Sequence, residues 1–191
     1  MRHSQFTVVF DACVLYPAPL RDMLMWLGLS GRFRPRWSAD IHMEWKRNLL
    51  RNRPDLTQAQ LDRTSELMDL AFPDGTVSGY RPLIEGLWLP DPDDRHVLAA
   101  AIRCGAGTIV TFNERDFPAR ALSTFGIEAQ HPDGFIVDLL SLDAAAVLHA
   151  VQQHRASLRN PPLSVPLYLE TLRRQALHQT VGVLTTYAGM L

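Results

Sequence analysis

Two short apolar runs limit the possible folds of this chain more than any other feature. Residues 6–10 (FTVVF) and 107–112 (GTIVTF) are rich in β-branched and aromatic residues and do not alternate apolar with polar positions. Strands of this kind are typical of parallel sheets that helices cover on both faces. The two runs therefore predict a buried parallel sheet.

The segments around these strands carry helix patterns with recognisable start and stop signals. Pro17 and Pro19 begin a helix that ends near Gly28 and Gly31. Ser38 is the N-cap of a predicted helix that runs to about residue 51, and the capping-box pair Thr57 and Gln60 begins a helix that ends before Pro73. Gly105 ends the predicted helix 95–104 (RHVLAAAIRC). A short strand near 127–129 and a helix over 133–140 follow. Strands that alternate with helices indicate an α/β fold with a parallel sheet flanked by helices.

The last 50 or so residues have a different pattern. Residues 143–158 and 166–191 are helical in pattern, and the segment RNPPLSVP (159–166) separates them. We expect two units: an α/β domain over 1–140 and a helical C-terminal extension over 141–191 that packs on it. Alternatively, apolar residues of the extension form a docking face for another chain, including a second copy of this one. These residues are Leu167, Leu172, Val181 and Leu184.

Composition limits the compartment and the partners. The formal net charge of −1 gives no overall attraction to nucleic acid or to an acidic membrane, so any such contact depends on local patches. Cys13 and Cys104 match no metal or redox spacing and are interpreted as small core residues of a reduced protein. We find no apolar run near the roughly 18 residues of a membrane helix and no signal-peptide pattern at the start. We therefore expect a cytoplasmic protein without a membrane partner.

Four carboxylates stand where the pattern predicts an inward face or a strand end. Asp11 follows the first strand, and Asp116 lies four residues after Phe112, where the second strand ends. Glu44 and Asp94 share the helical spacing of the apolar residues in their own helices. In an open α/β sheet, ligands bind in the crevice at the carboxyl ends of the strands. Asp11 and Asp116 are therefore expected to face that crevice.

Each acid also has a purely structural interpretation. Asp94 can cap its helix, Asp11 can close an Asx-turn, Asp116 can begin a helix and Glu44 can pair with an arginine. Four acids that converge would repel one another by several kcal/mol, about 4 kcal/mol for one pair at 4 Å and an effective dielectric constant near 20. A cation offsets this cost. Oxygen ligands without cysteine or a histidine set favour Mg²⁺, or Mn²⁺, which suits phosphoryl chemistry.

Four motifs in this order resemble the PIN-domain nucleases, which include the VapC-type toxins of bacterial toxin–antitoxin pairs. The motifs are VVFDACVL, SADIHMEWKRNLL with Glu44, DPDDRHVLAAA and GTIVTFNERDFP. The resemblance covers roughly residues 6–140 and leaves the helical extension outside. It implies a three-layer α/β/α sandwich with a central parallel sheet and Mg²⁺-dependent cleavage of RNA by an endoribonuclease.

The resemblance also implies roles for particular residues. Asp11, Asp94 and Asp116 match the acids that hold one or two metal ions, and Glu44 matches an acid that binds a metal or orients the attacking water. Thr111 and Asn113 match a polar pair that hydrogen-bonds the carboxylates or a phosphate oxygen; ending a strand and making an Asx-turn is the structural alternative. Asp91 and Asp93 are alternatives to Asp94, which we choose because it begins the apolar stripe of its helix.

Basic residues suggest where RNA and a protein partner could bind. The segment GRFRPRW places arginines between Phe33 and Trp37, and the next helix carries more cations; the candidates are Arg32, Arg34, Arg36, Lys46 and Arg47. Such interleaved side chains can hold a phosphate backbone and stack on unpaired bases, although a solvated surface is the alternative. In the family, cognate antitoxins often block the active site, so an arginine surface near the acids could also receive an antitoxin.

Other functional classes fit less well. A phosphatase or receiver domain requires a lysine near a late strand, but the only lysine is Lys46, in an early helix. The segment HMEW lacks the Pro-Cys-x-x-Cys of zinc deaminases, and the histidines show no ligand spacing. Two alternatives stay open: a PIN-fold RNA-processing nuclease without an antitoxin, and an inactive PIN-fold binding module.

Overall fold

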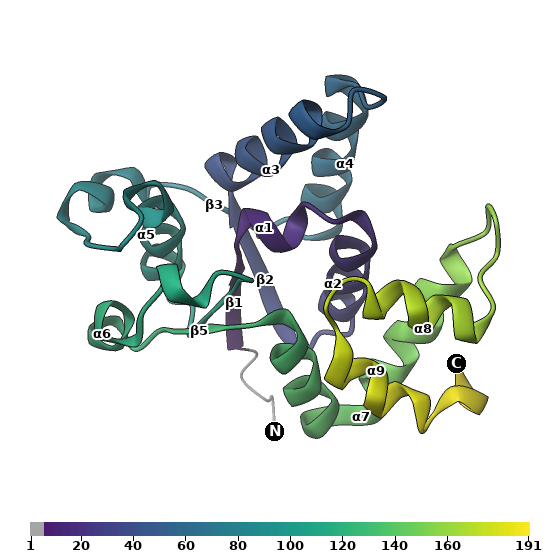
Figure 1. Cartoon of the computed structure of the whole chain (residues 1–191). Coiled ribbons are helices and arrows are strands. Elements are labelled where there is room, and N and C mark those ends of the chain that lie inside the picture. Colours follow the sequence, from purple (N-terminus) through teal and green to yellow (C-terminus); the bar gives the residue numbers. More distant parts are fainter. Residues whose placement is uncertain (1–5) are drawn as a thin grey trace.

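A five-stranded parallel sheet forms the centre of the protein. The computed structural model describes residues 6–191. The strands are β1 (Phe6–Phe10), β2 (Phe33–Ser38), β3 (Thr76–Val77), β4 (Thr108–Val110) and β5 (Glu128–Gln130). They lie in the order β3-β2-β1-β4-β5, and every neighbouring pair is parallel (Figure 1). The predicted α/β fold with a central parallel sheet is confirmed.

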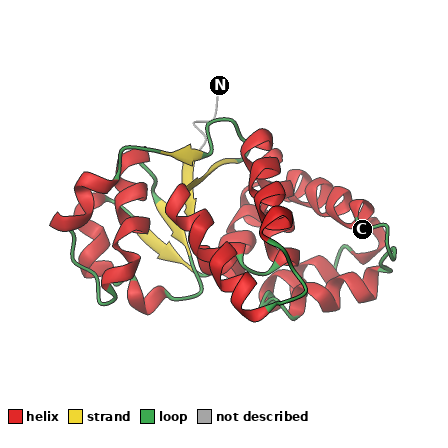
Figure 2. Ribbon diagram, turned by 90° about the horizontal axis from the view of Figure 1, so that it is seen from above, coloured by secondary structure: helices red, strands yellow, loops and turns green. Residues whose placement is uncertain are grey.

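Helices lie on both sides of this sheet (Figure 2). The α-helices are α1 (Ala12–Leu15), α2 (Ala18–Leu29), α3 (Ala39–Asn52), α4 (Gln58–Ala71), α5 (Arg95–Cys104), α6 (Ala119–Leu122), α7 (Pro132–Ser157), α8 (Val165–Arg173) and α9 (His178–Thr185). Short 3₁₀ turns are η1 (Arg81–Gly86), η2 (Pro92–Asp94), η3 (Glu114–Asp116), η4 (Ser123–Phe125) and η5 (Ala188–Met190). In Figure 1, α5 lies to the left of the sheet and α2 and α7 lie to the right, which gives three layers.

The predicted helix ends are confirmed where a side chain or a glycine satisfies the backbone. The Ser38 hydroxyl accepts the Ile41 N–H at the start of α3. Thr57 and Gln60 form both hydrogen bonds of the capping box of α4. Gly105 ends α5 at φ 64°, in the left-handed region that glycine adopts without steric cost. These helix ends are set by residues that are close together in the chain, so they can be predicted from the sequence.

β2 and β3 were not predicted from the sequence, where the β2 segment was interpreted only as a basic, aromatic stretch that binds RNA or is solvated. β2 contains Pro35 and several arginines, which argue against a strand inside a sheet. The structure tolerates Pro35 because β3 pairs with β2 only at Trp37 and Ser38, beyond the proline. The side chains of β2 alternate between buried and exposed at Phe33, Arg34 and Pro35, so the strand has the period of two that a half-covered strand requires.

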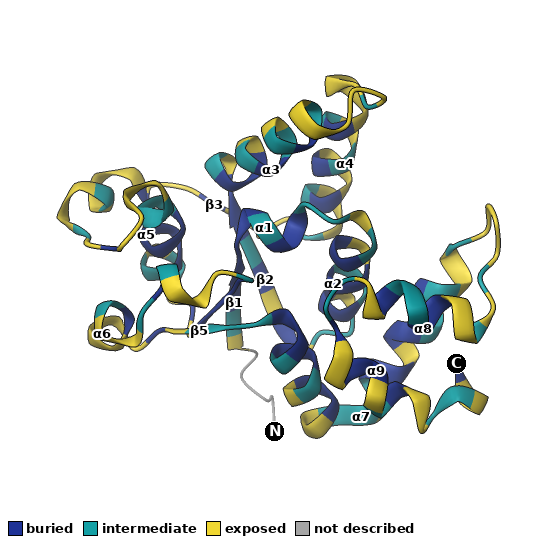
Figure 3. Cartoon of the chain, viewed as in Figure 1, coloured by how far each residue is buried: buried dark blue, intermediate teal, exposed yellow. Residues whose placement is uncertain are grey.

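Aromatic rings join the sheet to α7. Phe10 and Phe33, on neighbouring strands, and Phe135, on α7, are all 2% exposed or less. The ring centroids of Phe33 and Phe135 lie 5.1 Å apart at an interplanar angle of 80°, and Phe10 meets both rings edge-on. Edge-to-face pairs of this kind stabilise a core beyond the area that they bury. The same face of the sheet carries α2 and α7, whose inner sides are dark blue in Figure 3.

The C-terminal helices belong to the same hydrophobic core. Leu172, Val181 and Leu184 are at most 1% exposed and pack in the main core cluster, whereas Leu167 is 58% exposed. The docking-face interpretation is therefore wrong for the three buried residues. α7 continues through residue 140 and departs from helical geometry at Asp143. The division into units 1–140 and 141–191 stays a prediction.

α7 also corrects one expectation about membranes. By length and composition alone, Pro132–Ser157 could cross a membrane, although the sequence analysis found no such run. Core helices of soluble proteins pass the same test, and the apolar side of α7 includes the buried residues Phe135, Ile136 and Val151. The packing of the helix accounts for its apolar composition.

A buried carboxylate ties α7 to α9. Asp133, in the first turn of α7, is 4% exposed. Its two carboxylate oxygens accept the backbone N–H groups of Gln179 and Thr180, each at 2.8 Å. These N–H groups belong to the first turn of α9 and would otherwise lack a partner. Asp133 therefore caps a helix that is 46 residues away in the chain.

Asp133→Ala should destabilise the protein by about 2–4 kcal/mol, because it leaves two buried N–H groups unpaired. Urea unfolding followed by circular dichroism measures the change. Asp138→Ala, on the exposed side of α7, is the control and should cost less than about 1 kcal/mol. A loss at Asp133 no larger than that of the control would contradict the capping role.

Candidate active site

Asp11 lies at the carboxyl end of β1, as the sequence predicts. Its backbone N–H donates to Val110 O at 3.1 Å and continues the pairing of β1 with β4. The side chain is 4% exposed and accepts hydrogen bonds from Ala12 N at 2.6 Å and from the Thr111 hydroxyl at 2.7 Å. Burial raises the pKa of Asp11, and the charge of Glu44 adds to this rise, while the hydrogen bonds from Thr111, Cys13 and Ala12 oppose it.

Cys13 is a member of this site that the sequence analysis missed. Its thiol donates to Asp11 Oδ2 at 3.1 Å and accepts the Phe112 backbone N–H at 3.3 Å. Burial and the nearby charge of Asp11 raise the pKa of the thiol, so it stays protonated and keeps its donor role. The prediction of a small core residue is incomplete, because Cys13 joins Asp11 to the end of β4. The pattern DAC offered no spacing that could reveal this contact.

Glu44 and His96 form a pair between α3 and α5. His96 Nε2 donates to Glu44 Oε2 at 3.2 Å, and the two side chains are 15% and 30% exposed. Burial alone would lower the pKa of His96, but the hydrogen bond and charge of Glu44, with the charges of Asp40 and Asp11, raise it. The sequence placed Glu44 on an inward face and suggested an arginine as its partner. The structure replaces that arginine with His96, which lies 52 residues away and which the sequence analysis did not select.

Asp94 begins α5 without capping it. No hydrogen bond joins its side chain to the first turn of α5, so the capping alternative is wrong. Burial raises the pKa of Asp94 to about 7, and the charges of Asp11, Asp91, Asp116 and Glu44 add to the rise, in that order. The other three predicted acids are therefore near enough to Asp94 for their charges to act on its carboxyl group. The Asp91 carboxylate accepts the Asp93 N–H at 2.9 Å and has a structural role in η2.

Thr111 and Asn113 differ in their contacts. Thr111 is fully buried, and its hydroxyl holds Asp11 as described. The backbone N–H of Asn113 donates to Thr111 Oγ1 at 3.0 Å, a side-chain turn just after β4, so the structural alternative is seen at Thr111; no side-chain cap forms at Asn113. Asp116 is half-buried at the end of η3. Across residues 6–191, no hydrogen bond or ion pair of the Asp116 or Asp94 carboxylate with another side chain is found.

These acids form a donor set that suits a hard cation. Carboxylates supply the oxygen ligands that such an ion prefers, and burial first, then the charges of the other acids, raise the pKa of Asp94. Within the described residues, no three acid, histidine or cysteine side chains are close enough to enclose an ion by themselves. Waters or a phosphate would have to complete the coordination, as is common for Mg²⁺.

The basic segment is placed differently from the expectation. Phe33 and Trp37 are 1% and 0% exposed, so the interpretation that they stack on bases is wrong. The β1–β2 register places Arg34 beside Thr7, four residues before Asp11 and about 13 Å from it along the strand. Arg32 and Arg34 therefore lie toward the other end of the sheet.

Two of the remaining cations already have partners. Arg36 donates to the Asp74 carbonyl, and Lys46 Nζ lies 2.8 Å from Asp62 Oδ1. Arg32 pairs with Asp143 at 2.8 Å, and Arg47 is exposed. RNA binding by this set stays a prediction.

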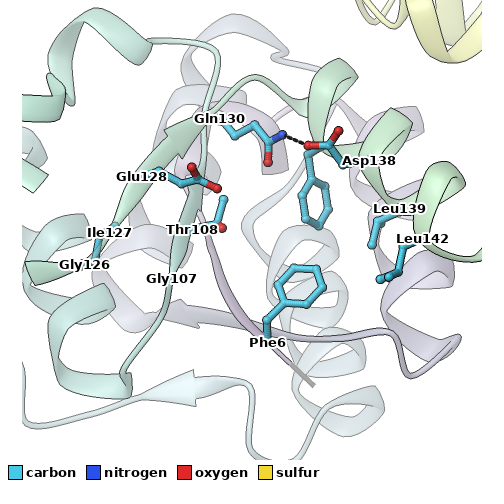
Figure 4. A pocket seen from close by; sticks show the side chains of 11 residues that line it. Phe6, Gly107, Thr108, Gly126, Ile127, Glu128, Gln130, Asp138, Leu139 and Leu142 are labelled. Atoms are coloured by element: carbon cyan, nitrogen blue, oxygen red, sulfur yellow. Dashed lines mark hydrogen bonds between the residues drawn. The ribbon is translucent and has the colours of Figure 1, made fainter. Parts of the chain in front are cut away.

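A separate cavity of about 690 Å³ lies at the other end of the sheet (Figure 4). Phe6, Thr108 and Glu128, the first residues of β1, β4 and β5, line it, as does α7 through Asp138 and Leu142. None of the four acids lines this cavity. Its volume alone does not make it the active site.

Comparisons with known proteins match two parts of the chain. The family model described as "PIN domain" matches residues 7–115, and the model described as "VapC50 C-terminal domain" matches residues 132–186. The second match spans α7 to α9. A curated protein of Mycobacterium tuberculosis named "Putative ribonuclease VapC50" is 40% identical over 82 residues, which are 43% of this chain and 48% of that protein. The chain thus spans about half the length of that relative. No solved structure matches.

Asp94→Asn should stabilise the metal-free protein. Because folding raises the pKa of Asp94 from 3.8 to about 7, the folded state binds the proton more tightly, and stability falls as pH rises through this window. The partly exposed group is screened, so we expect a gain of about 1 kcal/mol at pH 8 in EDTA, or about 2–4 °C in Tm. The gain should vanish below about pH 4.

Asp93→Asn, at the exposed neighbouring position, is the matched control and should leave Tm unchanged. Thermal unfolding at several pH values compares the two variants. A clear loss of stability in Asp94→Asn at pH 8 would mean that the carboxylate has a structural role.

Proposed function

Because the chain belongs to the PIN-domain family, we propose that it is a Mg²⁺- or Mn²⁺-dependent endoribonuclease that hydrolyses RNA phosphodiester bonds. One electrostatic observation carries this proposal: burial and the charges of Asp11, Asp91, Asp116 and Glu44 raise the pKa of Asp94 to about 7. Such a convergence of acids is costly unless a cation or a proton offsets it. Catalysis by a divalent ion accounts for keeping it.

Asp11, Asp94, Asp116 and Glu44 would hold the ion, directly or through water. When bound, a divalent ion neutralises phosphate charge, lowers the pKa of a coordinated water and stabilises the leaving oxygen. The carboxylates of Asp94 and Asp116 are available for this role, because the described residues provide them with no hydrogen bond or ion pair. Carboxylates supply the hard oxygen ligands that Mg²⁺ and Mn²⁺ favour.

Other residues hold the acids in position. Thr111 and Cys13 both donate to Asp11 Oδ2, and Ala12 N donates to Oδ1, so the Asp11 carboxylate cannot rotate freely. His96 directs Glu44 in the same way through one hydrogen bond, and Glu44 would orient the attacking water. Outer groups of this kind set the position and basicity of metal-binding carboxylates. Asn113, which follows Thr111 and is exposed, would contact a phosphate oxygen.

We further propose that the enzyme is the toxin of a toxin–antitoxin pair. The relative from M. tuberculosis is named "Putative ribonuclease VapC50", and the match at α7–α9 is to a domain described as "VapC50 C-terminal domain". The partners would be an RNA substrate and a cognate antitoxin protein. We place the activity in the cytoplasm, where the free thiols of Cys13 and Cys104 stay reduced. Assembly of several copies stays a prediction.

The central test is cleavage of RNA by the purified protein. With Mg²⁺ or Mn²⁺ it should cut members of a panel of single-stranded and structured RNAs, and EDTA or Asp11→Asn should reduce cutting to the level of buffer alone. Asp74→Asn, an exposed aspartate outside the site, is the matched control and should keep full activity. A metal-loaded protein that leaves the whole panel intact would sink the nuclease proposal and favour a binding module.

We expect His96 to affect catalysis because it orients Glu44, and not only because it stabilises the fold. We expect His96→Leu to lower kcat by about 10–100-fold, because an outer group that orients a metal-site carboxylate is lost. His96→Gln should recover much of this loss, since its amide N–H can donate to Glu44 as Nε2 does. Equal losses in both variants, with equal changes in Tm, would show only a packing role.

A further inference from the structure

One tryptophan differs from the others in its exposure. Trp37 and Trp45 are fully buried and Trp26 is half-buried, whereas Trp88 is 58% exposed. Trp88 lies in the segment between η1 and η2, just before the DPDD sequence. An indole ring exposed to this extent contributes little to the core. Its exposure, six residues before Asp94 in the chain, suggests a contact with something outside the chain.

A guanidinium group fixes one face of this ring. Arg120 Cζ of α6 lies 4.9 Å from the centroid of the Trp88 ring, within the range of a cation–π interaction. Arg120 lies over one face of the ring, and Trp88 is still 58% exposed, so much of the side chain is accessible to a partner. In the described residues, Arg120 and Arg115 form no ion pair, in contrast to Arg32, which pairs with Asp143. The positive charge of Arg120 is therefore free for a phosphate.

The chain keeps this pair close to the acids. Trp88 precedes Asp94 by six residues, and Arg120 follows Asp116 by four. An extended chain spans at most about 3.6 Å per residue, so the Cα atom of Arg120 lies within about 15 Å of that of Asp116. The helices that follow these acids, α5 and α6, lie on the same side of the sheet in Figure 1. RNA held at the acids would reach the ring within a few nucleotides.

We propose that Trp88 and Arg120 form a platform that binds an unpaired base of the RNA substrate beside the acidic site. The ring stacks on the base and the guanidinium contacts the adjacent phosphate, the combination by which proteins bind single strands. A base inside a duplex has both faces covered by its neighbours, so it cannot use this ring. The platform therefore selects single-stranded segments, and this inference rests on the proposed nuclease function.

The arginine also addresses an electrostatic problem of the site. Asp91, Asp93, Asp94, Glu114 and Asp116 lie in the two segments that carry the platform, and they repel a polyanion. Arg115 and Arg120, in the second of these segments, offset part of this repulsion where the strand approaches. A neutral aromatic ring alone would not reduce the repulsion between the acids and the RNA. This explains why the exposed indole is paired with a cation rather than with another apolar side chain.

The test measures RNA binding separately from cleavage. The full chain with Asp11→Asn, in Mg²⁺ buffer, holds RNA uncut, and an unstructured RNA oligonucleotide is titrated against it while tryptophan fluorescence is recorded. Because Trp88 alone among the tryptophans is largely exposed, stacking should quench its emission. Trp88→Phe should remove the quench and keep most of the affinity, and Trp88→Ala should weaken binding by about 5- to 100-fold.

Two further variants and one further RNA make the result specific. Arg120→Ala should weaken binding and reduce its dependence on salt, because one phosphate contact is lost. Leu70→Ala, which truncates a side chain that is 70% exposed on α4, should leave affinity unchanged. A blunt-ended RNA duplex without unpaired bases should bind the Trp88→Ala variant as well as its parent.

Two outcomes would overturn the platform: unchanged affinity of Trp88→Ala for the unstructured RNA, or equal losses for both RNAs. Intact RNA binding by Trp88→Ala together with lost binding of a co-encoded protein partner would assign the ring to protein docking instead. If the wild-type chain cuts no RNA but the quench and its loss in Trp88→Phe are observed, the nuclease proposal fails and the platform stands.

Discussion

The structure depends on one buried carboxylate at the place where two parallel strands end. Asp11 is almost fully buried, and an ionised carboxylate there is costly unless donors surround it. Ala12, Cys13 and Thr111 supply those donors from the turn after β1 and from the end of β4. The same contacts that make the buried acid tolerable also fix its direction. The same hydrogen bonds therefore stabilise the carboxyl ends of β1 and β4 and hold the Asp11 carboxylate in place.

Other acids in the chain follow different physical rules. Asp133 is as buried as Asp11, but both of its carboxylate oxygens accept N–H groups of the first turn of α9. Asp133 therefore stabilises the fold. The carboxylates of Asp94 and Asp116 have no such donors among the described residues, and the charges of other acids raise the pKa of Asp94 in addition to burial. Satisfied acids stabilise the structure, whereas unsatisfied acids close to one another mark a site that needs a cation.

The parts of the fold that were predicted correctly depend on local signals. The N-cap at Ser38, the capping box of Thr57 and Gln60 and the left-handed Gly105 act within one turn of a helix, so nearby residues reveal them. β2 was not predicted because a proline and two arginines in this segment argue against a strand inside a sheet. Only its pairing with β1, and the short reach of β3, show why a proline is acceptable in that strand.

The sequence by itself determined the class of the fold and the position of Asp11 at the end of β1, because period and chain order control both, whereas Asp116 lies in η3, six residues after β4 ends. Only the tertiary structure decided the partners of those acids. His96 meets Glu44 across 52 residues, Thr111 meets Asp11 across 100, and Trp88 meets Arg120 across a segment that contains two of the acids. No local pattern encodes such pairs, because packing of the helices on the sheet brings these residues together.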